Sequence, residues 1–232
     1  MRYVPAGLAI LCLLVVLQSS RAAEPLDLDI IKTDETPEQL CDRLVGDPFV
    51  GFGPLEWARP FASIDAYRAV PACVKAMRAH PGARGYTFKA GLAFLAAQKN
   101  EAGKKLLDRL TGENDPSALL ALAYIAPEGE AVELMRRASE QGSPTATMLF
   151  GMARLTGKGA PRDEIEGVRL VRQAADSGST RAMLILANLH NEGAYGVGYA
   201  PEEAKRLVAE AAARGDPRAK NLLADLNTPP TN

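Results

Sequence analysis

The sequence contains few of the residues on which catalytic and metal sites are usually built. Its 232 residues include two histidines, three cysteines and one tryptophan, and only 6% are aromatic. With two imidazoles, a Ser-His-Asp or Cys-His group has few ways to assemble. The sequence also lacks the His-Glu-x-x-His and Gly-x-Ser-x-Gly motifs and any close cluster of metal ligands. We therefore expect no catalytic residue, no metal and no cofactor.

The sequence also lacks an excess of charge of either sign. Its 27 basic and 28 acidic residues leave a formal net charge of −1, which is unlike the basic balance of nucleic-acid-binding domains. A hydrophobic content of 47% argues against a disordered chain. The length is sufficient for one globular or elongated domain. We expect a monomer that does not bind nucleic acid.

Only one apolar run is long, and it lies at the N-terminus. It extends from Tyr3 to about Leu17, which is shorter than the roughly 18 to 20 residues that span a bilayer. The small-x-small pattern Ser20-Arg21-Ala22 follows, as is typical of a signal peptidase site. Residues 1–22 are therefore predicted to be a signal peptide cleaved after Ala22, which leaves a periplasmic or secreted protein that is not inserted in the membrane. The alternative is an uncleaved membrane anchor.

Acidic residues are concentrated just after the predicted cleavage site. Eight lie between Glu24 and Asp47, against two basic residues in the same stretch. Up to about Thr36 this stretch shows no helical periodicity. Residues 23–38 are therefore predicted to be a flexible acidic leader.

Removal of the signal peptide would leave two of the three cysteines, Cys41 and Cys73. An even pair in an oxidising compartment most simply forms one disulfide. This bridge would close a loop of about 33 residues and stabilise the fold by roughly 3–4 kcal/mol. The alternative is a redox or nucleophilic role, but the sequence has no Cys-x-x-Cys motif to support it.

Downstream, the sequence repeats itself. A pattern that begins at Ala146 recurs at Ala182 and Ala219, at intervals of 36 and 37 residues. Shorter units of 28 residues begin at Ala90 and Ala118, because their internal connection lacks about eight residues. Each unit ends in a residue suited to a left-handed backbone conformation. These unit-ending residues are Asn114, Gly142, Gly178 and Gly215.

Each unit has the apolar spacing of two helices, for example residues 145–155 and 163–177. Neither helix can bury its apolar stripe alone, so the units must stack, and the predicted fold is an all-α solenoid of antiparallel helix pairs. Between these two helices lies Gly157-Lys158-Gly159-Ala160-Pro161, which superficially resembles a phosphate-binding loop. Lys158 is followed by glycine instead of the required Ser or Thr. We interpret this stretch as a hairpin connection, and a nucleotide site as the weaker alternative.

The pattern Ala-x₃-apolar-Gly…Gly-x-Gly-x-Pro-x-Asp…Ala-Ala-x-x-Gly resembles the Sel-one-like repeat (SLR), a relative of the tetratricopeptide repeat. Departures from it are Arg154 and His190 in place of Tyr, Ala200 in place of Asp, and Gly167 in place of Ala. The resemblance implies a right-handed α-solenoid that binds other proteins and has no catalytic centre. The residues that match are Ala146, Phe150, Gly151, Gly157, Gly159, Asp163, Ala174, Ala175 and Gly178.

The resemblance is strong over residues 116–226 and weaker over about 69–115, and the region from about Pro37 to Pro60 does not fit the repeat. We assign residues 39–115 to an N-terminal cap followed by tetratricopeptide-like repeats. In the cap, Thr36 and Pro37 have the residue types of an N-cap and a first helical position. The next helix is predicted to begin at Pro71. Trp57 is expected to pack in the cap, with ligand stacking as the alternative. Residues 227–232 form a C-terminal tail.

The register of the repeat predicts a binding surface. In stacked helix pairs, the first helix of each unit lines the concave side, and its residues that face neither neighbour are available to a partner. Met and Tyr suit such a role because Met adapts to irregular surfaces and Tyr offers contact area. Alternatively, Leu120, Met148 and Met152 are ordinary core residues. The predicted partner-binding residues are Leu120, Tyr124, Met148, Met152, Asn188 and Asn191.

Two hypotheses about function follow. The first is an exported, non-enzymatic scaffold or adaptor that binds a protein partner in a concave groove. The second is a periplasmic cell-wall hydrolase or glycan-binding protein on a helical scaffold, which would require two acidic side chains that converge in a cleft. The adjacent acids Glu202 and Glu203 lie at a predicted helix start, where carboxylates stabilise the helix.

Overall fold

The computed structural model describes residues 34–46, 61 and 63–227, and within these ranges every regular element is an α-helix. The predicted signal peptide, most of the acidic leader, Trp57 and the end of the tail lie outside the described residues. The helices are α1 (Pro37–Val45), α2 (Ala66–Ala79), α3 (Arg84–Ala96), α4 (Asn100–Thr111), α5 (Pro116–Ala123), α6 (Glu128–Glu140), α7 (Pro144–Thr156), α8 (Glu164–Asp176), α9 (Thr180–Glu192), α10 (Pro201–Ala213) and α11 (Pro217–Asn227).

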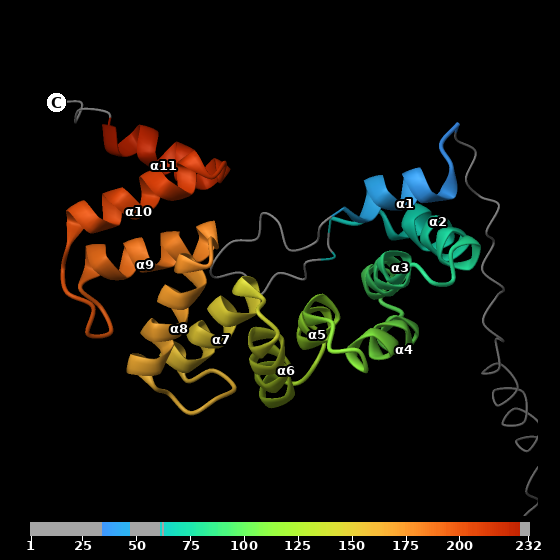
Figure 1. Cartoon of the computed structure of the whole chain (residues 1–232), viewed down its shortest axis with the longest axis horizontal. Coiled ribbons are helices and arrows are strands. Elements are labelled where there is room, and N and C mark those ends of the chain that lie inside the picture. Colours follow the sequence, from blue (N-terminus) through green and yellow to red (C-terminus); the bar gives the residue numbers. More distant parts are fainter. Residues whose placement is uncertain (1–33, 47–60, 62, 228–232) are drawn as a thin grey trace, which may run out of the picture.

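The helices form a solenoid, and this confirms the predicted all-α fold. Each helix packs mainly against its neighbours in sequence, and the pairs follow one another along a curved path (Figure 1). Helices α3 and α5 lie on the inner side of this curve, and their partners α4 and α6 lie on the outer side (Figure 1). The chain therefore presents one inner and one outer face.

The joints between units combine two local signals. The residue that ends each unit has a positive φ, at Asn114 (56°), Gly142 (82°), Gly178 (91°) and Gly215 (95°), as the sequence predicted. The next residue then caps the following helix. After Gly178, for example, the backbone N–H of Ser179 donates to Ala174 O at 3.0 Å, and its hydroxyl accepts from the N–H of Ala182. Each joint thus ends one helix and begins the next within two residues.

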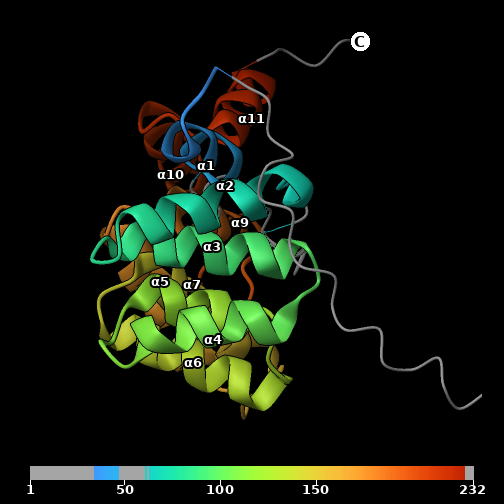
Figure 2. The same ribbon diagram turned by 90° about the vertical axis from the view of Figure 1, so that its right-hand side faces the viewer.

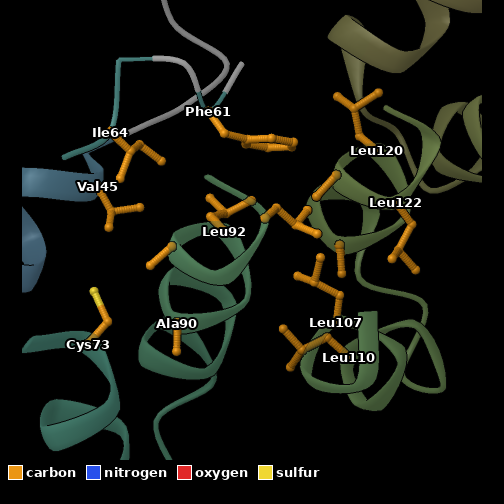
Figure 3. Packing of buried hydrophobic residues seen from close by; sticks show 14 of the residues in the cluster. Val45, Phe61, Ile64, Cys73, Ala90, Leu92, Leu107, Leu110, Leu120 and Leu122 are labelled. Carbon is orange, nitrogen blue, oxygen red and sulfur yellow. The ribbon is translucent and has the colours of Figure 1, made fainter. Parts of the chain in front are cut away.

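Fully buried alanines hold the first helices in register. The alanine that opens each predicted unit is 0% exposed in every case. Between these positions, larger side chains fill the space between the helices. Figure 3 shows Leu92 of α3, Leu107 of α4 and Leu120 of α5 gathered in one buried cluster. The opening alanines are Ala90, Ala118, Ala146, Ala182 and Ala219.

At the N-terminal end, α1 packs across α2 (Figure 2). Helix α1 begins as predicted, with Thr36 as N-cap in a capping box and Pro37 in the first turn. The predicted start of the following helix at Pro71 is wrong, because Asp65 caps it six residues earlier by accepting a hydrogen bond from the N–H of Arg68. Pro71 lies inside α2 and is buried, so apolar packing offsets the backbone hydrogen bond that proline cannot donate.

Candidate interaction surface

The inner face of the solenoid is built from one stripe of residues on each first helix. On each helix the stripe consists of the residue before the buried alanine and the residues three and seven positions further on, which share one side of a helix. In α5, α7 and α9 these stripes are Ser117, Leu120 and Tyr124; Thr145, Met148 and Met152; and Arg181, Leu184 and Asn188. We refer to these nine residues as the inner stripe.

Burial divides the residues predicted to bind a partner. Leu120 and Met148 are each only 1% exposed, so their side chains are core residues and present no surface to a partner. Their position midway along each stripe places them between neighbouring units, where close packing excludes solvent. Tyr124 and Met152 are half-buried, whereas Asn188 and Asn191 are exposed. These four residues remain the predicted contact set.

Tyr124 is held in place by aromatic packing. Its ring stands edge-on to that of Phe61, with ring centroids 6.1 Å apart and an angle of 81° between the planes. Burial raises the pKa of the Tyr124 hydroxyl, and the nearby Arg181 opposes this shift. Further along the inner face, Asn188 donates a 2.9 Å hydrogen bond from Nδ2 to Glu192 Oε1 on its own helix. The inner face therefore changes from aromatic to polar character along the solenoid.

Sequence reasoning missed Arg181, the charged residue of the inner stripe. It lies directly before the buried Ala182 and is half-buried. Burial lowers the pKa of its guanidinium, while Tyr124 and Asp216 act in the opposite direction and Arg218 adds to the lowering. The repeat register could have identified Arg181, because it lies three residues before Leu184 and seven before Asn188, on the same side of the helix.

The stretch that resembles a phosphate-binding loop is the connection from α7 to α8. Gly157 and Gly159 both have positive φ, 75° and 72°, as expected of a turn. A Cβ at Gly159 would lie 2.7 Å from the carbonyl oxygen of Glu128, so this turn also packs closely against α6. Lys158 points toward Glu128, with Nζ 3.8 Å from a carboxylate oxygen. These features explain the glycines as requirements of packing and turn geometry.

The carboxyl groups with resolved pKa shifts lie in structural ion pairs and helix caps. Hydrogen bonds from Arg169 and Arg206 lower the pKa of Glu166 and Glu203, which lie three residues earlier on the same outer helices. A general acid would need a raised pKa instead. Within the described ranges, no group of three or more His, Cys, Asp or Glu side chains is arranged to hold a metal ion.

A surface depression of about 460 Å³ on α4 does bring two acids together, Glu101 and Asp108. Both belong to a single helix, and they share the depression with Lys104, Lys105 and Arg109. A glycoside hydrolase site instead flanks its substrate with two carboxyl groups. This depression therefore gives no support to the hydrolase alternative.

Cys41 of α1 and Cys73 of α2 form a disulfide, with their Cα atoms 4.8 Å apart. Both cysteines are completely buried. The bridge ties the first helix to the solenoid, a use of cysteine that is compatible with a protein outside the cytoplasm. Among the helices that the structure describes, none is both long and apolar enough to cross a membrane.

Comparison with known proteins agrees with this architecture. The Sel1 repeat model matches residues 128–143, 146–179 and 180–216. The last two matches meet between Ser179 and Thr180, at the joint where Ser179 caps α9. The matched part of the chain, between residues 128 and 216, is built of Sel1 repeats. The first of the three matches covers only α6 of the short α5–α6 unit.

Solved structures of Sel1 repeat proteins share the fold. A Sel1 repeat protein from Oxalobacter formigenes aligns with a TM-score of 0.56 at 22% identity, over 69% of this chain and 68% of that one. The protein c5321, a protective antigen present in uropathogenic Escherichia coli strains that displays an SLR fold, aligns with a TM-score of 0.55 at 20% identity. That alignment covers 70% of this chain but only 37% of c5321. No curated protein matches the chain.

Sel1 repeats are typically non-enzymatic scaffolds that mediate interactions between proteins. The arrangement of this chain agrees with that role at the level of the fold, because each unit adds one first helix to a continuous inner face.

Proposed function

We propose that this Sel1 repeat protein is an exported adaptor without enzymatic activity that binds a protein partner on the inner face of its solenoid. The observation that supports this best is the row formed by Tyr124, Met152 and Asn188. These residues occupy the same register position, Tyr124 at the C-cap of α5 and the other two in α7 and α9, and all three retain exposed surface. Such a row crosses three units, so an extended partner segment could contact them in succession.

The chemistry of the row suits protein recognition. Tyr124 supplies a ring already held by Phe61, so little side-chain entropy is lost when it binds. Met152 adapts its shape to irregular apolar surfaces. Asn188 and Asn191 offer polar groups at the exposed end of the row.

Export is part of the proposal. It rests on the N-terminal apolar run followed by Ser20-Arg21-Ala22, and on the buried Cys41–Cys73 bridge, which persists most readily in an oxidising compartment.

The proposal is tested by capture of the partner with the mature chain. Crosslinking in periplasmic extract, followed by mass spectrometry, should identify a specific protein that the variant Tyr124→Ala/Met152→Ala/Asn188→Ala no longer captures. A matched triple variant of exposed residues on the outer helices, Arg172→Ala/Asp176→Ala/Lys205→Ala, should capture it normally. Circular dichroism should show native helix content for both variants. Capture that survives the inner substitutions, or that is lost with the outer ones, would show the surface to be wrongly assigned.

A further inference from the structure

We infer that the partner segment carries a carboxylate and that Arg181 binds it on the inner face. This inference rests on the proposed function, since it specifies the chemistry of the partner at the same surface. It starts from an unusual feature of Arg181, which is a half-buried cation that forms no ion pair or hydrogen bond with any residue in the described ranges.

Comparison of equivalent positions in the repeats shows how unusual an unpaired Arg181 is among the described residues. The residues that precede the opening alanines are Lys89, Ser117, Thr145, Arg181 and Arg218. Lys89, the other half-buried cation of this set, is paired with Asp42 of the N-terminal cap, with Nζ 2.6 Å from the carboxylate. Asp42 therefore supplies a carboxylate to Lys89, whereas no described residue forms such an ion pair with Arg181.

The surroundings of Arg181 disfavour its positive charge. It lies in the first turn of α9, where the positive end of the helix dipole repels a cation. Burial removes hydration, and Arg218 adds a second positive charge nearby. A carboxylate placed beside Arg181 would relieve all three effects at once.

The acidic residue that attracts Arg181 is already engaged by other groups. Asp216 attracts Arg181 electrostatically, but its Oδ2 accepts a 2.8 Å hydrogen bond from the hydroxyl of Thr180. Its Oδ1 accepts from the backbone N–H groups of Arg218 and Ala219, at 3.0 and 3.1 Å, as the cap of α11. Asp216 therefore serves the helix start, and the guanidinium of Arg181 is left without an ion-pair partner among the described residues.

The residues around Arg181 define the rest of the ligand. Tyr124 lies close enough to Arg181 for each to shift the pKa of the other. Leu184 and Met152 add half-buried apolar surface to the same inner stripe. The surface thus fits an extended peptide segment with an Asp or Glu next to an apolar side chain.

A binding experiment on the mature chain tests the inference and does not require the natural partner. Twelve-residue peptides selected from a displayed random library would be synthesised as fluorescent probes, each paired with a version in which Asp and Glu are replaced by Asn and Gln. Fluorescence anisotropy should show that the acidic version binds about tenfold more tightly, as expected for one charge-assisted contact. This comparison uses only the wild-type protein.

Variants then assign the effect to Arg181. In Arg181→Gln the acidic and amide peptides should bind equally, whereas Arg172→Gln on the outer face of α8 should keep the tenfold preference. Arg181→Lys retains the positive charge and should keep part of the preference for the acidic peptide. This variant still tests the inference if Arg181→Gln fails to fold.

Three outcomes would overturn the inference. If selected peptides bind the inner face, as judged by loss in Met152→Ala, but show no preference for carboxylates, the acidic ligand is wrong while the proposed function stands. If no peptide depends on the inner face, both fail. If Arg181 mediates self-association in sedimentation experiments, the occupant is a second copy of the chain.

Discussion

At the scale of single residues, this chain departs from the usual repeat pattern at Arg154 and His190, and each side chain contacts the loop that follows its helix. Arg154 stands at a position usually held by Tyr, and it donates to the carbonyl oxygen of Pro161 and to Asp163 Oδ2, at 2.9 and 2.8 Å. His190 occupies the equivalent position, and its Nδ1 lies 3.2 Å from the carbonyl oxygen of Gly198. Each of these polar side chains thus holds the loop that follows its helix.

The Arg154–Asp163 contact predicts a pH dependence of stability. A hydrogen bond from the backbone N–H of Glu166 lowers the pKa of Asp163 below its usual 3.8, and Arg154 adds to this effect. Because the pKa is lower in the folded state, the contribution is present above the unfolded value and is lost as the pH falls through the folded one. Asp163→Asn should therefore lower the urea midpoint at neutral pH, and the difference should shrink below pH 3.8.

A double-mutant cycle provides the control. Arg154→Gln should cause a similar loss at neutral pH, and combining it with Asp163→Asn should cost less than the sum of the two. Strictly additive effects would show that the two residues do not act together.

At the scale of helices, pairs are held close by glycines that face each other. In the α7–α8 pair, a Cβ on Gly167 would lie 2.8 Å from the backbone nitrogen of Leu155 and 2.9 Å from the carbonyl oxygen of Gly151. The α3–α4 pair repeats the arrangement with Gly91 and Gly103, where a Cβ on Gly103 would lie 2.9 Å from Gly91 O. Glycine at these positions sets the distance between the helices.

Gly167→Ala should destabilise the chain even though the family usually has Ala at this position. The added methyl group meets backbone atoms that cannot move aside, so we expect a loss of about 1–3 kcal/mol in unfolding free energy. Gly129→Ala is the matched control, since it also lies in a second helix but a Cβ there meets nothing within 4 Å. This control should be neutral or stabilise by up to about 1 kcal/mol. Equal effects in urea denaturation would contradict the close-packing explanation.

The disulfide between α1 and α2 should contribute to the stability of the N-terminal end. It links residues 32 positions apart, and in the chain-entropy model such a loop is worth roughly 3–4 kcal/mol. Cys41→Ala/Cys73→Ala should lower the free energy of unfolding accordingly, and hydrogen exchange should show the loss concentrated in α1 and α2. A reductant should reproduce this in the wild type and leave the double variant unchanged. Free thiols titrated in native protein would rule out the bridge.

At the scale of the whole molecule, both the buried core and the proposed binding surface extend across successive units. The buried residues form two clusters, one from Leu40 to Ala146 and one from Met148 to Ala219. They adjoin at α7, where Leu149 packs against both. The inner face crosses this boundary, since Tyr124 packs on the first cluster and Met152 on the second. A partner bound along the inner face would therefore contact residues that pack on both clusters.

The proposed export depends on the N-terminal residues of the full chain and is tested on the expressed protein. We expect cleavage after Ala22, because the apolar run before Ser20-Arg21-Ala22 is too short to span a bilayer. N-terminal sequencing of protein recovered from the periplasm or medium should begin at Ala23. Recovery of the intact chain in the membrane fraction would instead support the uncleaved anchor.

Features that depend on local backbone chemistry could be predicted from the order of residues alone. The repeat register, the positive φ at Asn114 and Gly178, and the capping box at Thr36 all follow from residue types within a few positions of each other. For the same reason the Gly157-Lys158-Gly159 connection could be recognised as a turn. Local signals of this kind are sufficient to predict helix pairs and their stacking into a solenoid.

The accessibility of the inner residues, in contrast, became clear only from the packing of the helices. Leu120 and Tyr124 look equally suitable in sequence, yet the first is buried and the second is only half-buried. The absence of an ion-pair partner for Arg181 among the described residues likewise depends on where Asp216, 35 positions further along the chain, directs its hydrogen bonds. The position of Pro71 inside α2, rather than at its start, also depends on burial against the core. Burial and charge pairing are set by contacts between units, which the order of residues within one unit does not specify.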